Sequence, residues 1–487
     1  MLVMILQLLL LFPSPVESQV DARPPNVVYI LADDLGWGEV GCYGQEKIRT
    51  PEMDKLSREG MRFTQHYSGS AVCAPSRCVL LTGKHTGHAV VRNNWENGGW
   101  GADEPEGQYP LPESEETIAE MLKERGYATA CIGKWGLGGP DTIGHPNKQG
   151  FDHFYGYLCQ RKAHNYYPAH LWRNDEKHII NDGEFYSAHQ RIESPLDSEQ
   201  AYRDAYDRKD YTPDLMRDEA IEFIRSNADK PFFLYYPSPI PHVAIQALQE
   251  EIEAYPREWD QEHYLGDKGY LPHPRPRAAY AAMITRLDSE IGEIVAELEK
   301  QGIADETIIM VSSDNGATYA GGVDYEFFDS SGPLRGLKGS LYEGGIRVPM
   351  IVRWPGRVAA GSTTDHVSAF QDVMPTIAEL TGDAIEAGDG VSFAPTLLGN
   401  GQKQHEVLYW EHGPKQAVRM GRWKGVRTGL KKGDLTVQLY DLESDPSEQK
   451  DVSADHPEIL TKVTELMETE RVPSTVFPLA TIDDVDS

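Results

Sequence analysis

The chain has 487 residues, of which 46 are Lys or Arg and 76 are Asp or Glu, so its formal net charge is −30. This acidic balance excludes a free-standing nucleic-acid-binding protein, which needs a basic face. With 40% hydrophobic and 25% charged residues, the composition is typical of a globular protein with a large core. Five cysteines are too few to make a disulfide scaffold of a chain this long.

The chain opens with an apolar run, Leu2 to Phe12, which has the length of a signal-peptide core and is shorter than the ~20 residues of a membrane span. Pro13 and Pro15 break the segment at once, which disfavours the alternative of a buried first strand or helix. A small-residue pattern ending at Ser18 is suited to cleavage. We predict a signal peptide over residues 1–18, export to the periplasm or the extracellular space, and no membrane span.

Four short apolar runs are typical of strands that are buried on both faces, as in a parallel sheet. Helices are predicted before the last three of these runs, around residues 118–122, 214–227 and 276–301. Strands that alternate with helices predict an α/β fold with a large doubly wound, mostly parallel sheet over residues 24–399. The four runs are Asn26–Ala32, Tyr127–Gly133, Pro231–Tyr236 and Thr307–Ser312.

Past about Gly399 the pattern changes to short strands that are separated by glycines and charged turns. A helix is predicted after them, near Glu458 to Thr469. We predict a smaller C-terminal antiparallel α+β subdomain over residues 400–480. Its strands are expected around Val407–Trp410, Ala417–Met420, Trp423–Arg427 and Gln438–Asp441.

Polar pairs follow the first and the last of the four predicted strands. Asp33 and Asp34 come after the first, and Asp314 and Asn315 come after the last. A single such pair is more often a helix cap or a turn, but ligands bind outside the carboxyl ends of strands in such sheets, so two pairs favour a metal site. Four hard oxygen ligands, three of them anionic, suit Ca²⁺. The chain has no CxxC pair and no HExxH motif, which disfavours zinc.

A reactive-residue motif stands at Cys73-Ala74-Pro75-Ser76-Arg77, with Leu-Leu-Thr-Gly at residues 80–83. The alternative to a reactive Cys73 is a buried thiol that takes no part in chemistry. If the segment opens a helix, Cys73 and Cys78 do not face one another, which argues against a disulfide between them.

Together these motifs resemble those of the sulfatase family of the alkaline-phosphatase superfamily. The similarity spans most of the chain and includes Pro241-His242 and the Lys338 segment RGLKGSLYEGGIRVP. The resemblance implies that a maturation enzyme oxidises Cys73 to formylglycine. As a hydrated aldehyde, residue 73 would attack sulfur with one hydroxyl, and its second hydroxyl would expel sulfate as the aldehyde re-forms.

The resemblance also implies roles for the residues around Cys73. Arg77 would hold the formylglycine hydrate, and Lys134 and Lys338 would bind the sulfate oxygens, although solvated surface lysines are the common alternative. His242 is the best general acid for the leaving oxygen, because a near-neutral pKa suits that task. The implied metal site comprises Asp33, Asp34, Asp314 and Asn315, with residue 73 beside them.

One position departs from the family. Many sulfatases read GKWHLG where this chain has GKWGLG at residues 133–138, so Gly136 replaces a histidine that is usually at the site. His145 and His164 lie downstream in loops that could bring an imidazole back. His164 ranks ahead, because the segment from Gln160 to Tyr167 falls where the family often contacts sulfate.

The predicted substrate is a sulfated mono- or oligosaccharide. The polar and aromatic loop from Gln160 to Trp172, which includes His164, and the Glu411-His412 turn suit hydroxyl bonding and ring stacking. A bulk charge of −30 repels a highly sulfated polymer, which favours short oligosaccharide ends. Two alternatives stay open: a phosphatase or phosphonate monoester hydrolase of the same superfamily, and a non-catalytic glycan-binding protein in which Cys73 remains a thiol.

Overall fold

The structure is a computed structural model, and it describes residues 23–382, 385 and 388–483. The signal peptide predicted over residues 1–18 lies outside this part of the chain. Within the described part, no helix is long and apolar enough to cross a membrane.

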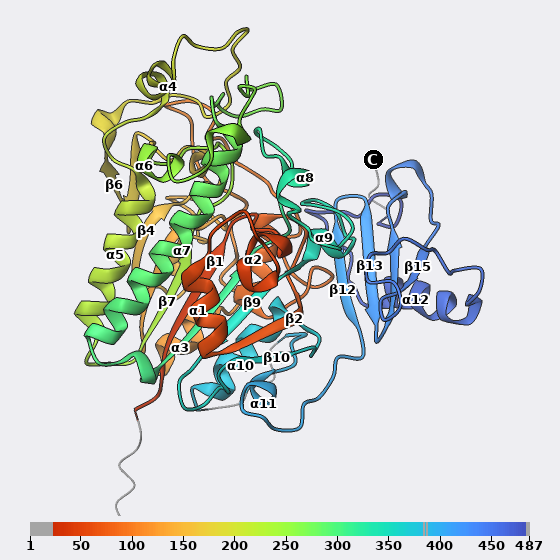
Figure 1. The fold of residues 1–487 in the computed structure, drawn as a ribbon. Helices are drawn as coiled ribbons and strands as arrows, with labels where there is room; N and C mark the ends of the chain where they lie inside the picture. The colour runs from red at the N-terminus through yellow and green to blue at the C-terminus, as the bar shows by residue number, and fades with distance from the viewer. Residues whose placement is uncertain (1–22, 383–384, 386–387, 484–487) are drawn as a thin grey trace, which may run out of the picture.

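The larger part of the chain forms a sheet of eleven strands with helices on both faces (Figure 1). The strands β8, β1, β7, β3 and β4 lie side by side and are parallel, whereas β9, β5 and β6 pair with their neighbours in the antiparallel sense. The fold class predicted from the alternating pattern is therefore confirmed. Across the sheet the strands are β10 (Ser362–Thr364), β2 (Met61–Tyr67), β9 (Arg347–Arg353), β8 (Thr307–Ser313), β1 (Asn26–Ala32), β7 (Phe232–Pro237), β3 (Ala128–Lys134), β4 (His153–Tyr157), β5 (His170–Arg173) and β6 (Glu176–Ile179), with β11 (Ser368–Ala369) beside β2.

Strand β1 shows why its sequence is apolar throughout. Val28 and Ile30 pack into the core on one face of the sheet, and Val27 and Tyr29 pack into the core on the other. The first core is covered by α1 (Pro51–Glu59), α5 (Thr212–Asn227) and α7 (Pro276–Lys300), and the second by α2 (Cys73–Thr82), α3 (Ile118–Glu124) and α10 (Val373–Leu380). Shorter helices lie in the connections: α4 (Glu199–Tyr206), α6 (Gln249–Ile252), α8 (Tyr325–Phe328), α9 (Glu343–Ile346) and α11 (Ala394–Leu397).

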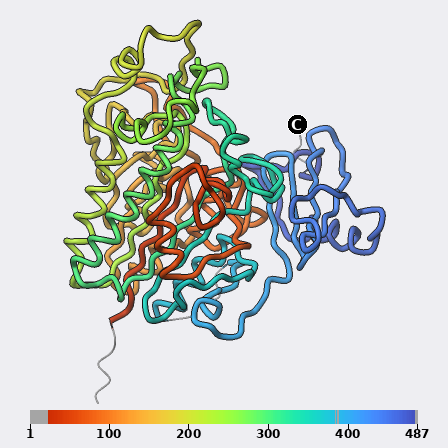
Figure 2. The backbone as a smooth tube through the Cα atoms, in the orientation of Figure 1, coloured from red at the N-terminus to blue at the C-terminus, as the bar shows by residue number. Residues whose placement is uncertain are grey.

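A separate sheet of four antiparallel strands lies to one side of the large sheet (Figure 2). It comprises β12 (Leu408–His412), β13 (Lys415–Met420), β14 (Trp423–Arg427) and β15 (Gln438–Asp441), and α12 (Pro457–Thr469) packs against it. The predicted antiparallel pairing is confirmed.

The small sheet is attached to the loops of the large one by buried charges. The ammonium group of Lys424 in β14 lies 2.8 Å from Glu343 of α9 and 3.0 Å from Glu448, and all three side chains are buried. Lys415 of β13 donates to the backbone carbonyl of Gly339 at 2.6 Å. The loop that contains Lys338 is therefore held from the side of the small sheet.

Candidate active site

Charged side chains meet at the carboxyl edge of four neighbouring parallel strands. Asp33 and Asp34 follow β1, Asp314 and Asn315 follow β8, and Lys134 ends β3. All five are at most 1% exposed. The predicted convergence of the two polar pairs is observed: the Asn315 amide nitrogen donates to Asp34 Oδ1 at 2.8 Å, and the Asp34 amide donates to Asp314 Oδ1 at 3.1 Å.

Helix α2 presents Cys73 to this edge as its first residue. Pro75 suits the first turn of a helix, and Gly83, at φ +69°, ends α2 in the left-handed conformation that glycine adopts readily. The Cys73 sulfur lies 3.4 Å from Asp33 Oδ1 and 3.6 Å from Lys338 Nζ. Because Cys73 and Cys78 are both free, the argument against a disulfide between them is confirmed.

Arg77 lies one turn along α2 and connects the helix to the acids. Its Nη2 is 2.8 Å from Asp314 Oδ2 and 3.6 Å from Asp33 Oδ2, and another guanidinium nitrogen donates to the Lys134 backbone carbonyl. With no exposed surface, this guanidinium is a fixed part of the site. Lys134 pairs with Asp33, and Lys338 approaches Asp34 to 2.7 Å.

Burial and charge pairing act against one another on these groups. Burial opposes ionisation of Asp33, but Lys134 and Arg77 outweigh it and hold the pKa of Asp33 below its usual range. Burial, followed by the charge of Asp33, raises the pKa of Asp314 to about 7. Burial works against the charge on Lys338, yet Asp34 holds the pKa of Lys338 well above its usual range.

The acids fit a hard divalent cation. Ligand atoms of Asp33, Asp34, Cys73 and His242 lie within 4.8 Å of one another. The amide oxygen of Asn315 is buried and has no hydrogen-bond partner, which is costly unless another group satisfies it. An oxygen-rich set with three carboxylates matches the donors that Ca²⁺ takes in proteins.

The Cys73 thiol is a poor nucleophile in this setting. Burial, and after it the charge of Asp33, raises the pKa of Cys73 far above its usual range. The thiol therefore stays protonated at neutral pH, although the surrounding cations are well placed for an anionic ligand.

Two stacked imidazoles form another wall of the site. His242 follows β7, and its Nε2 is 3.7 Å from Asp34 Oδ2. The ring of His164 stacks on it with centroids 4.5 Å apart and an angle of 9° between the planes. Burial, and next Lys338, lowers the pKa of His242 to about 4, so the expected near-neutral pKa is wrong for this state of the site. Sequence analysis missed His189 and Tyr270, which contact His164 from loops that carry no motif.

Gln160 occupies the space beside Gly136. A Cβ atom on Gly136 would lie 2.4 Å from Gln160 Nε2 and 2.8 Å from its Cγ. Gly136 also has φ +87°, which side chains rarely adopt. Gln160 Nε2 is buried and has no hydrogen-bond partner. Of His145, Gln160 and His164, which the sequence analysis considered near the position of the missing histidine, the structure places Gln160 against Gly136 and His164 against His242.

His145 and Glu411 have partners elsewhere, whereas the Nδ1 of His412 is buried and has no hydrogen-bond partner among the described residues. His145 accepts from the Asn147 amide at 3.3 Å, and its Nε2 lies 3.2 Å from the Asn174 carbonyl, so the structure does not bring it to the cluster. Glu411 is buried in ion pairs with Arg92 and Arg471, at 2.9 and 2.8 Å, which leaves it unavailable for a sugar hydroxyl. Burial, and next Lys415, lowers the pKa of His412 to about 4.

Helices on both faces of a mostly parallel sheet, with the reactive groups at its carboxyl edge, define a hydrolase of the alkaline-phosphatase type. The family model described as Sulfatase matches residues 25–383, so the chain belongs to the sulfatase family and is a sulfuric ester hydrolase. A second model, described as N-sulphoglucosamine sulphohydrolase, C-terminal, matches residues 337–472.

Individual relatives resemble the chain over nearly its whole length. It is 31% identical to arylsulfatase A of Homo sapiens, with 91% of this chain and 87% of that protein covered. It is 29% identical to an N-acetylgalactosamine-6-O-sulfatase of Bacteroides thetaiotaomicron, over 92% and 93% of the two chains. The crystal structure of Ps i-CgsB in complex with k-i-k-neocarrahexaose superimposes with a TM-score of 0.74 and 28% identity, over 92% and 94% of the two chains.

Proposed function

We propose that the protein removes sulfate from a sugar, with residue 73 acting as formylglycine and Ca²⁺ bound at the polar pairs Asp33-Asp34 and Asp314-Asn315. The observation that carries the proposal is the position of Cys73, which stands at the start of α2 within 3.4 to 3.6 Å of Asp33 and Lys338. Formylglycine supplies a hydroxyl nucleophile where the buried thiol is a poor one.

Each neighbouring side chain has a task in this reaction. Lys134 and Lys338 neutralise the sulfate oxygens, and Arg77 orients residue 73 through its bonds to Asp314 and to the Lys134 carbonyl. Asp33, Asp34, Asp314 and Asn315 would hold Ca²⁺, which stabilises negative charge on oxygen when bound.

His242 is the proposed general acid. Its Nδ1 faces the Val243 carbonyl at 2.6 Å, so Nδ1 carries a proton and Nε2 is the nitrogen that faces the site. A sugar alkoxide is a poor leaving group and needs a proton, which His242 can give from Nε2 only as an imidazolium that carries protons on both nitrogens. The negative charge of a bound sulfate favours that form over the neutral ring, and the ring returns to neutral imidazole when the alcohol leaves. His164 orients the His242 ring by stacking on it.

The proposal that the substrate is a sugar sulfate rests on the relatives of the chain. The Bacteroides relative is named for N-acetylgalactosamine sulfate, and the crystal structure of Ps i-CgsB holds a neocarrahexaose. Export, which would give access to extracellular glycans, and a formylglycine-generating maturation enzyme complete the proposal.

Mass spectrometry of the peptide around Cys73 tests the proposal together with an activity assay. Conversion to formylglycine lowers the mass of that peptide by ~18 Da relative to the thiol. Cys73→Ala is the matched inactive control. A converted protein that releases sulfate from sugar sulfates supports the proposal. A converted protein that cleaves only phosphate or phosphonate esters favours the alternative hydrolase, and an unconverted, inactive protein that still binds glycans favours the glycan-binding alternative.

A further inference from the structure

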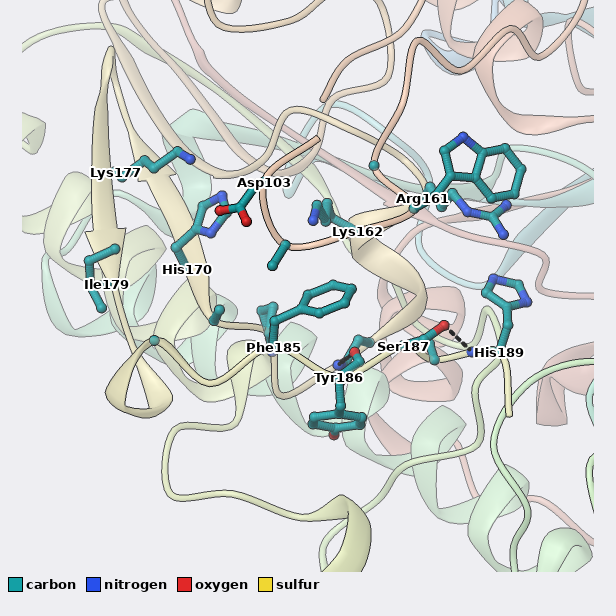
Figure 3. A pocket seen from close by; sticks show the side chains of 18 residues that line it. Asp103, Arg161, Lys162, His170, Lys177, Ile179, Phe185, Tyr186, Ser187 and His189 are labelled. Carbon is teal, nitrogen blue, oxygen red and sulfur yellow. Dashed lines mark hydrogen bonds between the residues drawn. The ribbon is translucent and has the colours of Figure 1, made fainter. Parts of the chain in front are cut away.

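A cavity of about 200 Å³ is lined in part by Arg161 and Lys162, two residues of the Gln160–His164 turn. At ~30 Å³ per water molecule, this is room for roughly seven waters or one ring-sized ligand. Figure 3 shows Phe185 and Lys162 in its middle, Lys177 at one end, and Arg161 and His189 at the opposite end.

The cavity is basic in a strongly acidic protein. Arg161, Lys162 and Lys177 line it together with one carboxylate, that of Asp103. Arg161 is paired with Glu96 at 3.8 Å, and Glu106 is paired with His170 at 2.8 Å, so Lys162 and Lys177 are the cations that remain. Within the part of the chain that the structure describes, neither Lys162 nor Lys177 forms an ion pair; their ammonium groups lie over the rings of Phe185 and Trp172, at 4.7 and 5.5 Å from the centroids. Lys162 donates to the Gly101 carbonyl at 2.9 Å, which fixes the side chain and leaves two of its three N–H donors. Two unpaired ammonium groups in one hollow suit an anion.

Aromatic surfaces in the cavity suit a sugar ring. Phe185 and Tyr186 line the wall, and Trp100 at the rim is 54% exposed under the Arg161 guanidinium. Flat apolar faces beside charged donors are the combination that binds a saccharide with an acidic substituent. An aliphatic ligand would leave these cations unmatched.

The cavity is connected to the catalytic cluster by two ring contacts. His189 lines the cavity and its ring centroid is 5.2 Å from that of His164, which stacks on His242 at 4.5 Å. The same turn of the chain contributes to the catalytic site and to the cavity, because Gln160 lies against Gly136 while Arg161 and Lys162 line the cavity.

We propose that this cavity binds a second anionic group of the substrate, a carboxylate or a sulfate on the sugar next to the one that is desulfated. The proposal rests on the proposed function and narrows its substrate class to acidic oligosaccharides. The cations of the cavity allow a short acidic oligosaccharide to bind although the chain as a whole carries −30.

The test compares three disaccharides that share the same target sulfate. In one the neighbouring sugar is a uronic acid, in the second it is the carboxyl-reduced neutral counterpart, and in the third it carries a second sulfate. We expect kcat/KM of the unmutated protein to be about tenfold higher for an acidic disaccharide than for the neutral one. The preference should shrink as salt is raised, because exposed charges are screened. Whichever acidic disaccharide is preferred identifies the anion.

Lys162→Gln and Lys177→Gln should each remove most of this preference and leave kcat/KM for the neutral disaccharide within about twofold. Lys431→Gln is the matched control, because it makes the same change of net charge at an exposed residue far from the cavity in sequence and should keep the preference. The proposal is overturned if the unmutated protein shows no preference, or if the lysine variants lose equally on all three substrates. A protein that cleaves none of them refutes the proposed function itself.

Discussion

The contact between Gly136 and Gln160 leads to a prediction whose size follows from the geometry. Gly136→Ala places a Cβ 2.4 Å from Gln160 Nε2, about 1 Å inside an ordinary van der Waals contact. Overpacking of this kind costs about 1 to 3 kcal/mol, and a side chain at φ +87° costs about 1 to 2 kcal/mol more. We expect Gly136→Ala to lower the free energy of unfolding by about 2 to 5 kcal/mol.

Gly126→Ala separates these two contributions. Gly126 has φ +82°, but a Cβ there would meet no heavy atom within 4 Å, so only the backbone cost applies. Combining Gly136→Ala with Gln160→Ala should recover about 1 to 3 kcal/mol of the steric part. Urea unfolding followed by tryptophan fluorescence measures five proteins, the unmutated one, the three single variants including Gln160→Ala, and the double variant, with the slopes compared to confirm a common unfolded state.

The reasoning is refuted if Gly136→Ala lowers the free energy of unfolding no more than Gly126→Ala does. It is also refuted if the effect of the double variant equals the sum of the effects of Gly136→Ala and Gln160→Ala to within about 0.5 kcal/mol. Activity gives a second readout. Gly136→His alone should be inactive or unfolded, whereas Gly136→His with Gln160→Ala restores the histidine usual in the family and should regain sulfatase activity.

Three further predictions concern the site and its supports. Asp314→Ala should lose activity and bound Ca²⁺ together, and metal analysis that finds tightly held zinc, or full activity after exhaustive chelation, would end the calcium proposal. His242→Ala should lose on the order of 10²-fold in kcat/KM on a sugar sulfate and much less on an activated aryl sulfate. Equal losses on the two substrates would rule out His242 as the general acid. His164→Ala should instead mainly raise KM on both substrates. Lys424→Met leaves the buried Glu343 without its ammonium partner and should destabilise the fold by about 3 to 5 kcal/mol in urea unfolding, and a cost below about 1 kcal/mol would contradict this.

Much of the scaffold was predictable because local patterns determine it. The first and last predicted strands, Asn26–Ala32 and Thr307–Ser312, match β1 and β8 to within a residue, since both are apolar on both faces. The meeting of Asp33-Asp34 with Asp314-Asn315 followed from the rule that parallel strands end at one edge. A helix opening at Cys73 was considered only as a condition in the argument about the disulfide, and α2 does begin at Cys73.

The side-chain environment at the site was less predictable. Whether His145, Gln160 or His164 reaches the cluster depends on the path of long loops, for which periodicity gives no signal. The low pKa of His242 arises from burial by residues distant in sequence and from Lys338, which the position of His242 after a strand does not reveal. The basic cavity combines residues 99–103 with residues 161–189; the polar and aromatic composition of residues 160–172 was recognisable, but its meeting with residues 99–103 was not.

The attachment of the Lys338 loop to the small sheet has a consequence for the order in which a working enzyme can form during synthesis. Every strand of the large sheet has left the ribosome before β13 and β14 exist. Lys415 and Lys424, which contact Gly339 and Glu343 just after Lys338, are therefore translated after the nucleophile, the acids and the loop itself. A nascent chain that stops after residue 399 contains all the proposed chemistry and keeps the backbone bonds of Lys338 and Gly339 to Ala317 and Ala71, but the loop that carries this sulfate-binding cation lacks its contacts with the small sheet.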